Sequence, residues 1–496
     1  MTEPGRATSV RHVFWCTLVG VLLLQTAWLM SIPSFRGPDE FDHAYKTAAV
    51  AHGELHTAGT APHGRGGLVS VPRGLVEAAS KACESRSYTG HDNCHPVDDA
   101  TTDVVQVATA AGAYDPAWYA VVGLATRWVS PTHLDLAMRL VGMLLAALLL
   151  AAAAATTAAW ARTRWPLVAL SLAATPTLAY STVIVSPNGV HYAAAMLAWA
   201  GALGLARSAA RPDERPVQFL VAVAVGASVM VCTHTTGPMW LALTGLLVLA
   251  LRPLRWWLGA VRSAPLPWLL AVGVTAVATL ASVGWTRAAN ANGLGAADPT
   301  LPAFHASLLV RSEILWPFQT VGAFPMRDDP APFVVYVVWF TLFLVLGAMA
   351  VRRAPARVRW VAVALVALVV TVPAVLTVIS FSSNGLAWQG RYALPLSIGM
   401  PLLAGWTLDR RPVRMGRHVP LLAAAAIGVA QLASVLHVAA KEMREYPVDP
   451  ISGTFTGGLL LMALLAVAGP LVSAGLANRD RGSADVEPVR VPVSVA

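Results

Sequence analysis

The chain has 496 residues, of which 56% are hydrophobic and only 12% are charged. Soluble domains are about a quarter charged, so this composition excludes an ordinary soluble enzyme and predicts a polytopic membrane protein. A net charge of +9 favours nucleic-acid binding in a soluble protein, but here we interpret it as membrane topology and expect no nucleic-acid partner.

The first apolar run, Val13–Met30, resembles a signal sequence. No Ala-x-Ala-like cleavage site follows it, because the next residues are Ser-Ile-Pro-Ser. We therefore expect a retained first membrane span, preceded by a cytoplasmic segment over residues 1–12.

Apolar runs of about 20 residues are long enough to cross a bilayer as helices, and the sequence predicts twelve of them. They are Val13–Met30, Leu134–Trp160, Trp165–Ile184, Gly189–Ala206, Val217–Cys232, Thr235–Leu251, Pro267–Trp285, Phe333–Val351, Trp360–Ile379, Tyr392–Leu408, Val419–Ala440 and Gly457–Leu476. The fold class is thus an all-α polytopic membrane protein with one transmembrane domain over residues 13–476. The polar tail 477–496 is expected to be disordered and cytoplasmic.

Arginines cluster in every second connection between these spans. The clusters are Arg162 and Arg164; Arg207, Arg211 and Arg215; Arg252, Arg255 and Arg262; Arg352, Arg353, Arg357 and Arg359; and Arg410, Arg411, Arg414 and Arg417. Arginine-rich loops remain in the cytoplasm. This alternation predicts a bacterial plasma (inner) membrane protein with both termini cytoplasmic and two long extracytoplasmic loops, 31–133 and 286–332.

The first long loop is expected to carry short helices that lie along the membrane surface. Apolar residues recur at helical spacing in Glu40–Ala51 and Ala117–Trp128, and both segments are too short to span. The glycine-rich stretch Gly64–Gly74 is expected to be flexible. Cys83 and Cys94 share this loop, and their spacing suits a disulfide in an oxidising compartment.

An acidic cluster follows the first span directly. Asp39, Glu40, Asp42 and His43 lie within five positions of one another, although acids near a bilayer are costly unless they face water, a partner or a substrate. A carboxylate here can act as a general base, and the group can bind a divalent metal. The alternative is an ordinary helix start, with Asp39 as the N-cap.

Two arginines are further candidates. Arg391, between Gln389 and Tyr392, lies at the outer end of a predicted span, where its guanidinium suits phosphate binding or, alternatively, anchors the span at the interface. Arg139 lies one turn into the second span, four residues after Asp135. A plain ion pair between these two is the structural interpretation, and substrate binding is the functional one.

Three short segments resemble motifs of a bacterial multi-pass membrane family, domain-of-unknown-function family 2142. Pro38–Tyr45 resembles its P-D-E-x-x-H-x-Y signature. Tyr114–Tyr119 resembles its Y-x-P-x-x-Y element, and Gln389–Pro395 its Q-G-R-Y-x-x-P element. The order and separation of the three agree over about residues 30–410.

That family is similar to the GT-C superfamily of membrane glycosyltransferases, which take a sugar from a polyprenyl-phosphate carrier. The resemblance implies that Asp39 is the catalytic base, with Glu40 as its alternative or partner, and that Arg391 contacts the donor phosphate. The other predicted substrate-binding residues are Asp42, His43, Arg139, Gln389 and Tyr392. One departure is the turn 186–189, which reads Ser-Pro-Asn-Gly where an aspartate is expected.

The leading hypothesis is therefore a transferase that moves a sugar from a polyprenyl-phosphate donor to a glycan, lipid or protein acceptor of the cell envelope. Membrane lipids are its other expected partners, and a divalent metal at the acidic cluster is one alternative. A transporter or lipid flippase is the second hypothesis, because twelve spans suit that class. A non-catalytic scaffold for envelope assembly is the third.

Overall fold

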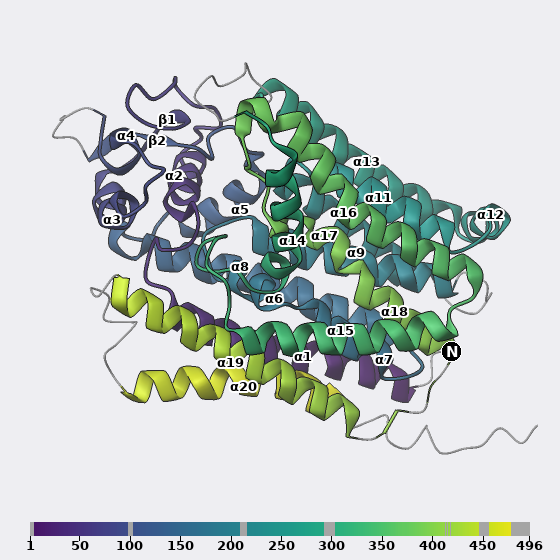
Figure 1. Ribbon diagram of the computed structural model, residues 1–496. Coiled ribbons are helices and arrows are strands. Elements are labelled where there is room, and N and C mark those ends of the chain that lie inside the picture. The colour runs from purple at the N-terminus through teal and green to yellow at the C-terminus, as the bar shows by residue number, and fades with distance from the viewer. Residues whose placement is uncertain are drawn as a thin grey trace, which may run out of the picture.

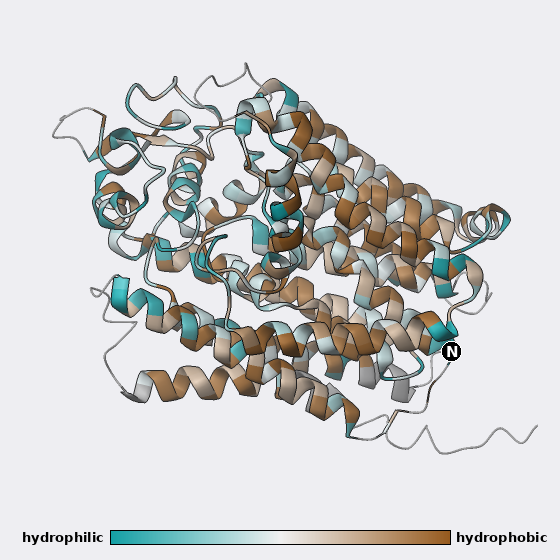
Figure 2. Ribbon diagram, in the orientation of Figure 1, coloured by the Kyte–Doolittle hydropathy of each residue, from teal (hydrophilic) through white to brown (hydrophobic). Residues whose placement is uncertain are grey.

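The computed structural model of the chain describes residues 4–97, 103–208, 216–291, 303–411, 413, 415–416, 418–445 and 456–477. Long helices run side by side through most of the molecule, and short helices gather with a two-stranded sheet at one end (Figure 1). Hydrophobic residues dominate the long helices, whereas the end with the short elements is richer in hydrophilic residues (Figure 2).

Among the described residues, seven helices are long and apolar enough to cross a membrane. They are α1 (Pro4–Ser31), α6 (Leu134–Trp160), α9 (Asn188–Ser208), α13 (Pro265–Ala288), α15 (Phe333–Arg353), α16 (Ala356–Asn384) and α19 (Val419–Glu445). The pair α11 (Gly237–Ala250) and α12 (Leu254–Ser263), bent by 102°, raises the number to eight. The chain is a helical, polytopic membrane protein as predicted, but twelve spans are not confirmed in the described residues.

Two of the predicted spans are broken helices rather than continuous ones. The span predicted at Trp165–Ile184 is divided into α7 (Trp165–Ala173) and α8 (Pro176–Ser181). The span predicted at Tyr392–Leu408 is divided into η2 (Gly390–Ala393), α17 (Leu394–Ser397) and α18 (Gly399–Arg410). Both breaks lie at prolines, Pro176 and Pro395, which have no backbone N–H to continue a helix.

The remaining helices differ from prediction mainly in length. The shorter apolar helices are α10 (Val217–Thr233) and the Gly458–Val472 part of α20 (Thr456–Ala477). The second long loop contains its own helix, α14 (Ala306–Gly322). At the N-terminus, α1 includes residues that were expected to precede it. Of the predicted tail 477–496, Ala477 is the last residue of α20, and residues 478–496 lie outside the described residues.

The first long loop folds into a small compact unit. Strand β1 (Gly67–Pro72) pairs antiparallel with β2 (Val104–Thr109), with Gly67 opposite Thr109. Around this sheet lie α2 (Glu40–Ala51), α3 (Arg73–Glu84), α4 (His91–Cys94), α5 (Pro116–Thr126) and η1 (Pro131–His133). The prediction that Gly64–Gly74 is flexible is wrong for the part that forms β1. The β-branched residues of this strand pair with β2, which lies far along the chain.

Helix α2 has the predicted bounds but not the predicted position. Every one of its twelve residues is buried, so it does not lie along the membrane surface. It packs instead against α5 and the sheet. In α5, Trp118 and Tyr119 are buried as well. The expectation of an interfacial helix is therefore wrong for α2, which the rest of the loop covers. In α5, by contrast, Val121 and Leu124 are exposed, as is Trp128 just after it, so an interfacial position of this helix stays a prediction.

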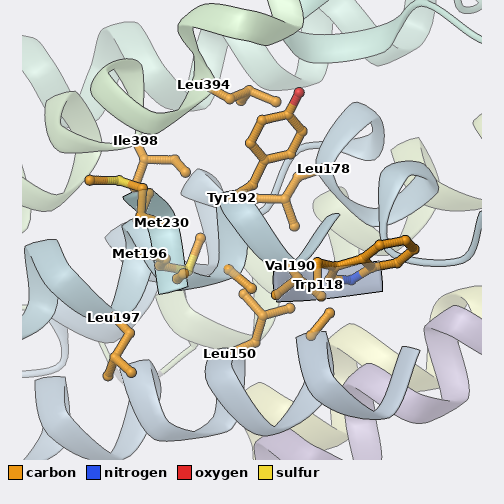
Figure 3. Packing of buried hydrophobic residues seen from close by; sticks show 14 of the residues in the cluster. Trp118, Leu150, Leu178, Val190, Tyr192, Met196, Leu197, Met230, Leu394 and Ile398 are labelled. Atoms are coloured by element: carbon orange, nitrogen blue, oxygen red, sulfur yellow. The ribbon is translucent and has the colours of Figure 1, made fainter. Parts of the chain in front are cut away.

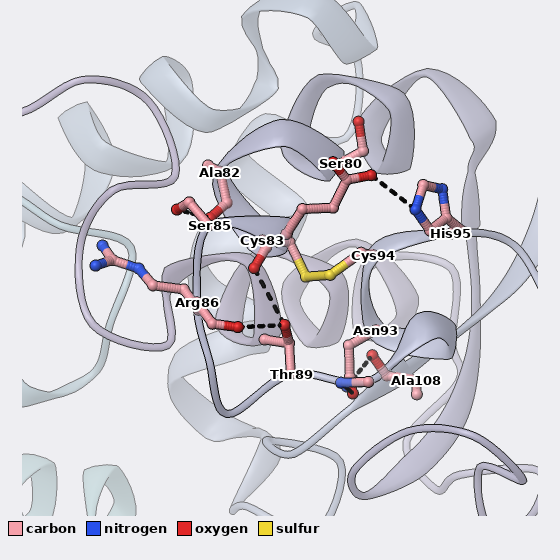
Figure 4. Close-up of a disulfide and its surroundings, with 12 residues drawn as sticks. Ser80, Ala82, Cys83, Ser85, Arg86, Thr89, Asn93, Cys94, His95 and Ala108 are labelled. Carbon is pink, nitrogen blue, oxygen red and sulfur yellow. Dashed lines mark hydrogen bonds and ion pairs between the residues drawn. A yellow bond between two sulfur atoms is a disulfide. The ribbon is translucent and has the colours of Figure 1, made fainter. Parts of the chain in front are cut away.

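A disulfide joins Cys83, in α3, to Cys94, in α4 (Figure 4). Both cysteine side chains of the disulfide are buried. Beside the bridge, the Thr89 hydroxyl donates to the Cys83 carbonyl at 3.1 Å, and His95 Nε2 lies 2.8 Å from the Glu84 carboxylate. The bridge and these bonds fix α3 against α4.

The loop unit rests on a tightly packed core formed by the membrane helices. Trp118 of α5 belongs to one buried hydrophobic cluster with Leu150 of α6, Val190 and Tyr192 of α9, and Leu394 of α17 (Figure 3). All five side chains are almost fully buried. This shared core connects the acidic motif's surroundings to α9 and to the segment that carries Arg391.

The opposite end of the bundle gathers arginines from several predicted cytoplasmic loops. Arg207, at the end of α9, forms a 2.8 Å ion pair with Asp409 of α18. Asp409 also accepts hydrogen bonds from the backbone N–H groups of Arg162 and Thr163. Three predicted loops thus meet at one end; Arg211, Arg215, Arg414 and Arg417 lie outside the described residues.

These positions make the topology testable by labelling single cysteines. We expect a Thr60→Cys variant to react with a membrane-impermeant maleimide in intact cells, and a Pro355→Cys variant to react only after permeabilisation, because arginine-rich loops stay inside. The parent protein, with buried Cys16 and half-buried Cys232, sets the background. The reverse labelling pattern contradicts the topology and moves the acidic cluster into the cytoplasm.

Candidate active site

The acidic motif begins in a tight turn between α1 and α2. Asp39 has a left-handed backbone, with φ 54° and ψ 21°, and its carboxylate makes no capping hydrogen bond to α2. Aspartate tolerates this region better than most residues, and such backbone strain concentrates at functional sites. Because Asp39 is only partly buried and does not cap the helix through its side chain, its carboxylate is available to a ligand.

Glu40, in contrast, has hydrogen-bond partners for both of its carboxylate oxygens. Its Oε1 accepts hydrogen bonds from Arg139 Nε at 2.8 Å and the Val185 N–H at 2.7 Å. Its Oε2 accepts from Arg139 Nη2 at 2.7 Å and the Gly37 N–H at 2.9 Å. With four donors and no exposed surface, Glu40 serves as an anchor of the turn rather than as a base.

Arg139 is the partner that holds this anchor in place. Besides Glu40, it donates to the carbonyls of Ile32 at 2.8 Å and Pro33 at 2.7 Å. The predicted local ion pair is present too, since Arg139 Nε lies 3.2 Å from Asp135. These contacts join the end of α1, the Asp39 turn and α6, and they leave the buried guanidinium engaged with protein groups rather than open to a substrate.

Asp42 joins α2 to the end of the sheet. Its Oδ1 accepts a 2.6 Å hydrogen bond from the backbone N–H of Ala110, and its carbonyl accepts from the Thr109 hydroxyl at 2.8 Å. Burial, together with the charge of Asp39, raises the pKa of Asp42 to about 7. Asp42 therefore supports the fold of the loop beside Asp39.

His43 faces a group of tyrosines. Its Nδ1 lies 2.8 Å from the hydroxyl of Tyr119, and its ring stacks on the same tyrosine with centroids 6.0 Å apart. Tyr114 lies on another side, also 6.0 Å away. Burial lowers the pKa of His43 to about 4, with Asp39 opposing the shift, so the imidazole is neutral at neutral pH.

The Gln389–Tyr392 segment is held against α14 by a close backbone approach. A Cβ on Gly390 would lie 2.1 Å from the Trp316 carbonyl oxygen, so only glycine fits there. The Gly390 N–H also donates to Gln319 Oε1 at 2.7 Å. Both contacts fix the 3₁₀ turn η2, which presents Arg391 and the partly exposed Tyr392; Gln389 immediately precedes it.

Arg391 is a buried cation without an acidic partner. It is 8% exposed, no carboxylate among the described residues lies within ion-pair distance, and its Nε has no hydrogen-bond partner there. Burial lowers the pKa of Arg391, but Tyr392, Tyr192 and Asp39 more than offset this, so its pKa is raised and it stays charged. An unpaired buried charge is costly, and an anionic ligand would compensate it.

Two histidines complete the same region. His191, in α9, is buried, and its Nδ1 lies 3.0 Å from the Met230 carbonyl. His234 follows α10, and its ring centroid lies 5.2 Å from that of His191 and 5.6 Å from that of Tyr392. These residues are far apart in the sequence, so their meeting near the Arg391 segment is not apparent from it.

The predicted site residues therefore separate into two groups. Asp39 is within electrostatic range of His43 and Arg391, as well as of Tyr88 and Tyr114. Glu40, Arg139 and Asp42 form a buried supporting layer behind Asp39. The first and last family motifs, which are more than 340 residues apart in the chain, thus meet at one place.

The acids of the motif do not converge on a metal site. Their carboxylates contact different partners, and in the described part of the chain no group of three or more histidine, cysteine, aspartate or glutamate side chains is placed to hold a metal ion. A metal requirement therefore stays a prediction without a described ligand set.

Comparisons with known proteins give a family and one structural likeness. The chain is similar to the crystal structure of ArnT from Cupriavidus metallidurans bound to undecaprenyl phosphate, with 14% sequence identity and a TM-score of 0.39 over 94% of this chain and 77% of that chain. No curated protein sequence matches the chain. The model of the predicted membrane protein family DUF2142 matches residues 22–400. The chain therefore belongs to the DUF2142 family of membrane proteins.

Proposed function

We propose that this protein is a glycosyltransferase that moves a sugar from a polyprenyl-phosphate donor to a hydroxyl group of a cell-envelope acceptor. The observation that carries the proposal is Arg391, a buried cation without an acidic partner among the described residues. It lies within electrostatic range of Asp39, whose carboxylate makes no capping hydrogen bond to α2. The motifs around both residues resemble those of the DUF2142 family, which is itself similar to the GT-C superfamily, and this supports the same assignment.

The proposed reaction is a single displacement with inversion at the anomeric carbon. Asp39 takes the proton of the acceptor hydroxyl, whose oxygen forms a bond to that carbon. The bond between the anomeric carbon and the phosphate oxygen breaks, and its electron pair leaves with the polyprenyl phosphate. Arg391 stabilises the negative charge that develops on this leaving group.

The supporting layer explains how Asp39 keeps a strained conformation. The Glu40–Arg139 pair fixes the residue directly after Asp39 and the carbonyls of Ile32 and Pro33 before it. Catalytic groups need such fixed surroundings, because small displacements lower the rate strongly. In the proposed topology, the site opens on the extracytoplasmic side of the plasma membrane, with both termini inside.

Replacing Arg391 by lysine tests the proposal. Lysine keeps the charge but not the planar fork that binds phosphate oxygens in pairs, so we expect transfer from polyprenyl-phosphate sugars to fall about tenfold to a hundredfold. The measurement is radiolabel transfer by purified protein in detergent. Arg127→Lys is the matched control, because Arg127 is exposed and stacks on Trp128; equal losses in both variants contradict the phosphate role.

A lipid-phosphate transporter is the second candidate, and the two broken helices favour it. Transporters commonly form their binding sites from discontinuous helices, and η2 with its cation lies at such a break. The Asp39→Asn variant distinguishes the two functions. A transporter moves polyprenyl phosphate across the proteoliposome membrane with or without this carboxylate, whereas a transferase loses sugar transfer in Asp39→Asn.

A further inference from the structure

His191 and His234 present opposite tautomers. A backbone N–H can only donate, and the Thr236 N–H points to His234 Nδ1 at 3.2 Å. His234 Nδ1 is therefore an acceptor, and in the neutral ring the proton is on Nε2. The Met230 carbonyl can only accept, so His191 carries its proton on Nδ1. His191 is thereby used by the protein, whereas the Nε2–H of His234 has no partner among the described residues.

His234 lies beside the buried cation. Its ring centroid is 5.6 Å from the Tyr392 ring, and the Arg391 guanidinium carbon is also 5.6 Å from that ring. His234 is also within electrostatic range of Arg391. His234 is partly exposed, unlike His191, so a ligand bound to Arg391 can reach it.

We infer that His234 is a second binding residue for the phosphate group, and that its Nε2–H donates a hydrogen bond to a phosphate oxygen held by Arg391. The inference rests on the proposed function for the kind of ligand, a phosphate ester at a membrane surface. It adds a neutral donor to a site that otherwise relies on one cation.

The electrostatic surroundings support a neutral donor at this position. Burial, together with the nearby Arg391 and His43, lowers the pKa of His234 to about 4. The rings that face His234 are those of His191 and Tyr392. A neutral N–H binds phosphate without adding a second buried charge beside Arg391, which would be costly.

Two substitutions separate ligand binding from a structural role. His234→Asn places its amide oxygen near the position of Nδ1, so it keeps the acceptor for Thr236 but removes the Nε2 donor. His234→Gln places an amide N–H near the position of Nε2, so it keeps the donor but loses the acceptor. A purely structural histidine is replaced better by asparagine, and a phosphate-binding histidine is replaced better by glutamine.

The experiment measures binding of undecaprenyl phosphate to the full-length protein in detergent by native mass spectrometry. Undecaprenol tests the need for phosphate, phosphatidylglycerol tests a phospholipid headgroup as the source, and inorganic phosphate tests a free anion. We expect His234→Asn to weaken undecaprenyl phosphate binding about tenfold or more with an unchanged melting temperature, and His234→Gln to retain more of the binding than His234→Asn.

Each other result has a defined meaning. If wild type binds undecaprenyl phosphate and His234→Asn binds it equally well, the inference is overturned while the proposed function stands. If binding depends on His234 as expected but no sugar is transferred, the proposed function fails and the phosphate site stands. If phosphatidylglycerol binds with the same dependence on His234, the site takes phospholipid headgroups. If the wild-type protein binds none of the phosphate probes, both the inference about His234 and the proposed function are wrong.

Discussion

Replacing Asp39 by asparagine is expected to reduce sugar transfer by about a hundredfold or more, while the protein still folds and inserts. Asparagine has the size of aspartate and tolerates the left-handed backbone of this position, but its amide cannot accept the proton of an acceptor hydroxyl. The loss therefore reports on the base and not on the turn. Initial rates of radiolabel transfer from a polyprenyl-phosphate sugar measure it.

Asp115→Asn is the matched control for this substitution. Asp115 caps α5, where its Oδ1 accepts a 2.9 Å hydrogen bond from the Ala117 N–H. Asparagine caps nearly as well as aspartate, so this variant should transfer sugar at close to the wild-type rate. Wild-type activity in Asp39→Asn shows that Asp39 is not the base, and the search then moves to the other acids of the motif.

Replacing Glu40 by glutamine is expected to give the largest loss of stability. The substitution leaves Arg139 buried without its main counter-charge and points an amide N–H₂ group at donors that now face a carboxylate oxygen. Breaking one partner of a buried pair typically costs about 3–5 kcal/mol. The free energy of unfolding in mixed micelles, followed by tryptophan fluorescence, measures the change.

Glu77→Gln provides the comparison for Glu40→Gln, because Glu77 is an exposed acid of α3. A surface change of this kind alters the free energy of unfolding by less than about 0.5 kcal/mol. If Glu40→Gln is as stable as Glu77→Gln but inactive, Glu40 acts in the chemistry and the supporting role assigned to it is wrong.

Local sequence patterns predicted individual helices well. Both Glu40–Ala51 and Leu134–Trp160 have the predicted bounds, because each combines helical spacing of apolar residues with a clear end. The breaks at Pro176 and Pro395 were missed, since hydropathy over a long window outweighs a single proline. The strands β1 and β2 were missed because 31 residues separate them, and pairing at that distance leaves no local pattern.

The candidate site was predicted in its residues but not in its division of roles. The pair of Asp135 and Arg139 follows from their spacing, and it is present. The pairing of Arg139 with Glu40 spans 99 positions, so it could not be predicted from spacing. For the same reason the acids of the motif were treated as one cluster, although their side chains face different partners. The meeting of His191 with His234, and of His234 with Tyr392 beside Arg391, was missed because it depends on how separate helices pack.

The most direct test of the proposed function is transfer of a radiolabelled sugar from defined polyprenyl-phosphate donors by the purified wild-type protein, with an envelope extract as acceptor. The proposal predicts that at least one donor is consumed, that polyprenyl phosphate is released, that the new glycosidic bond has the inverted anomeric configuration, and that Asp39→Asn abolishes all three. Equal transfer by wild type and Asp39→Asn, or transfer with retained configuration, would contradict it.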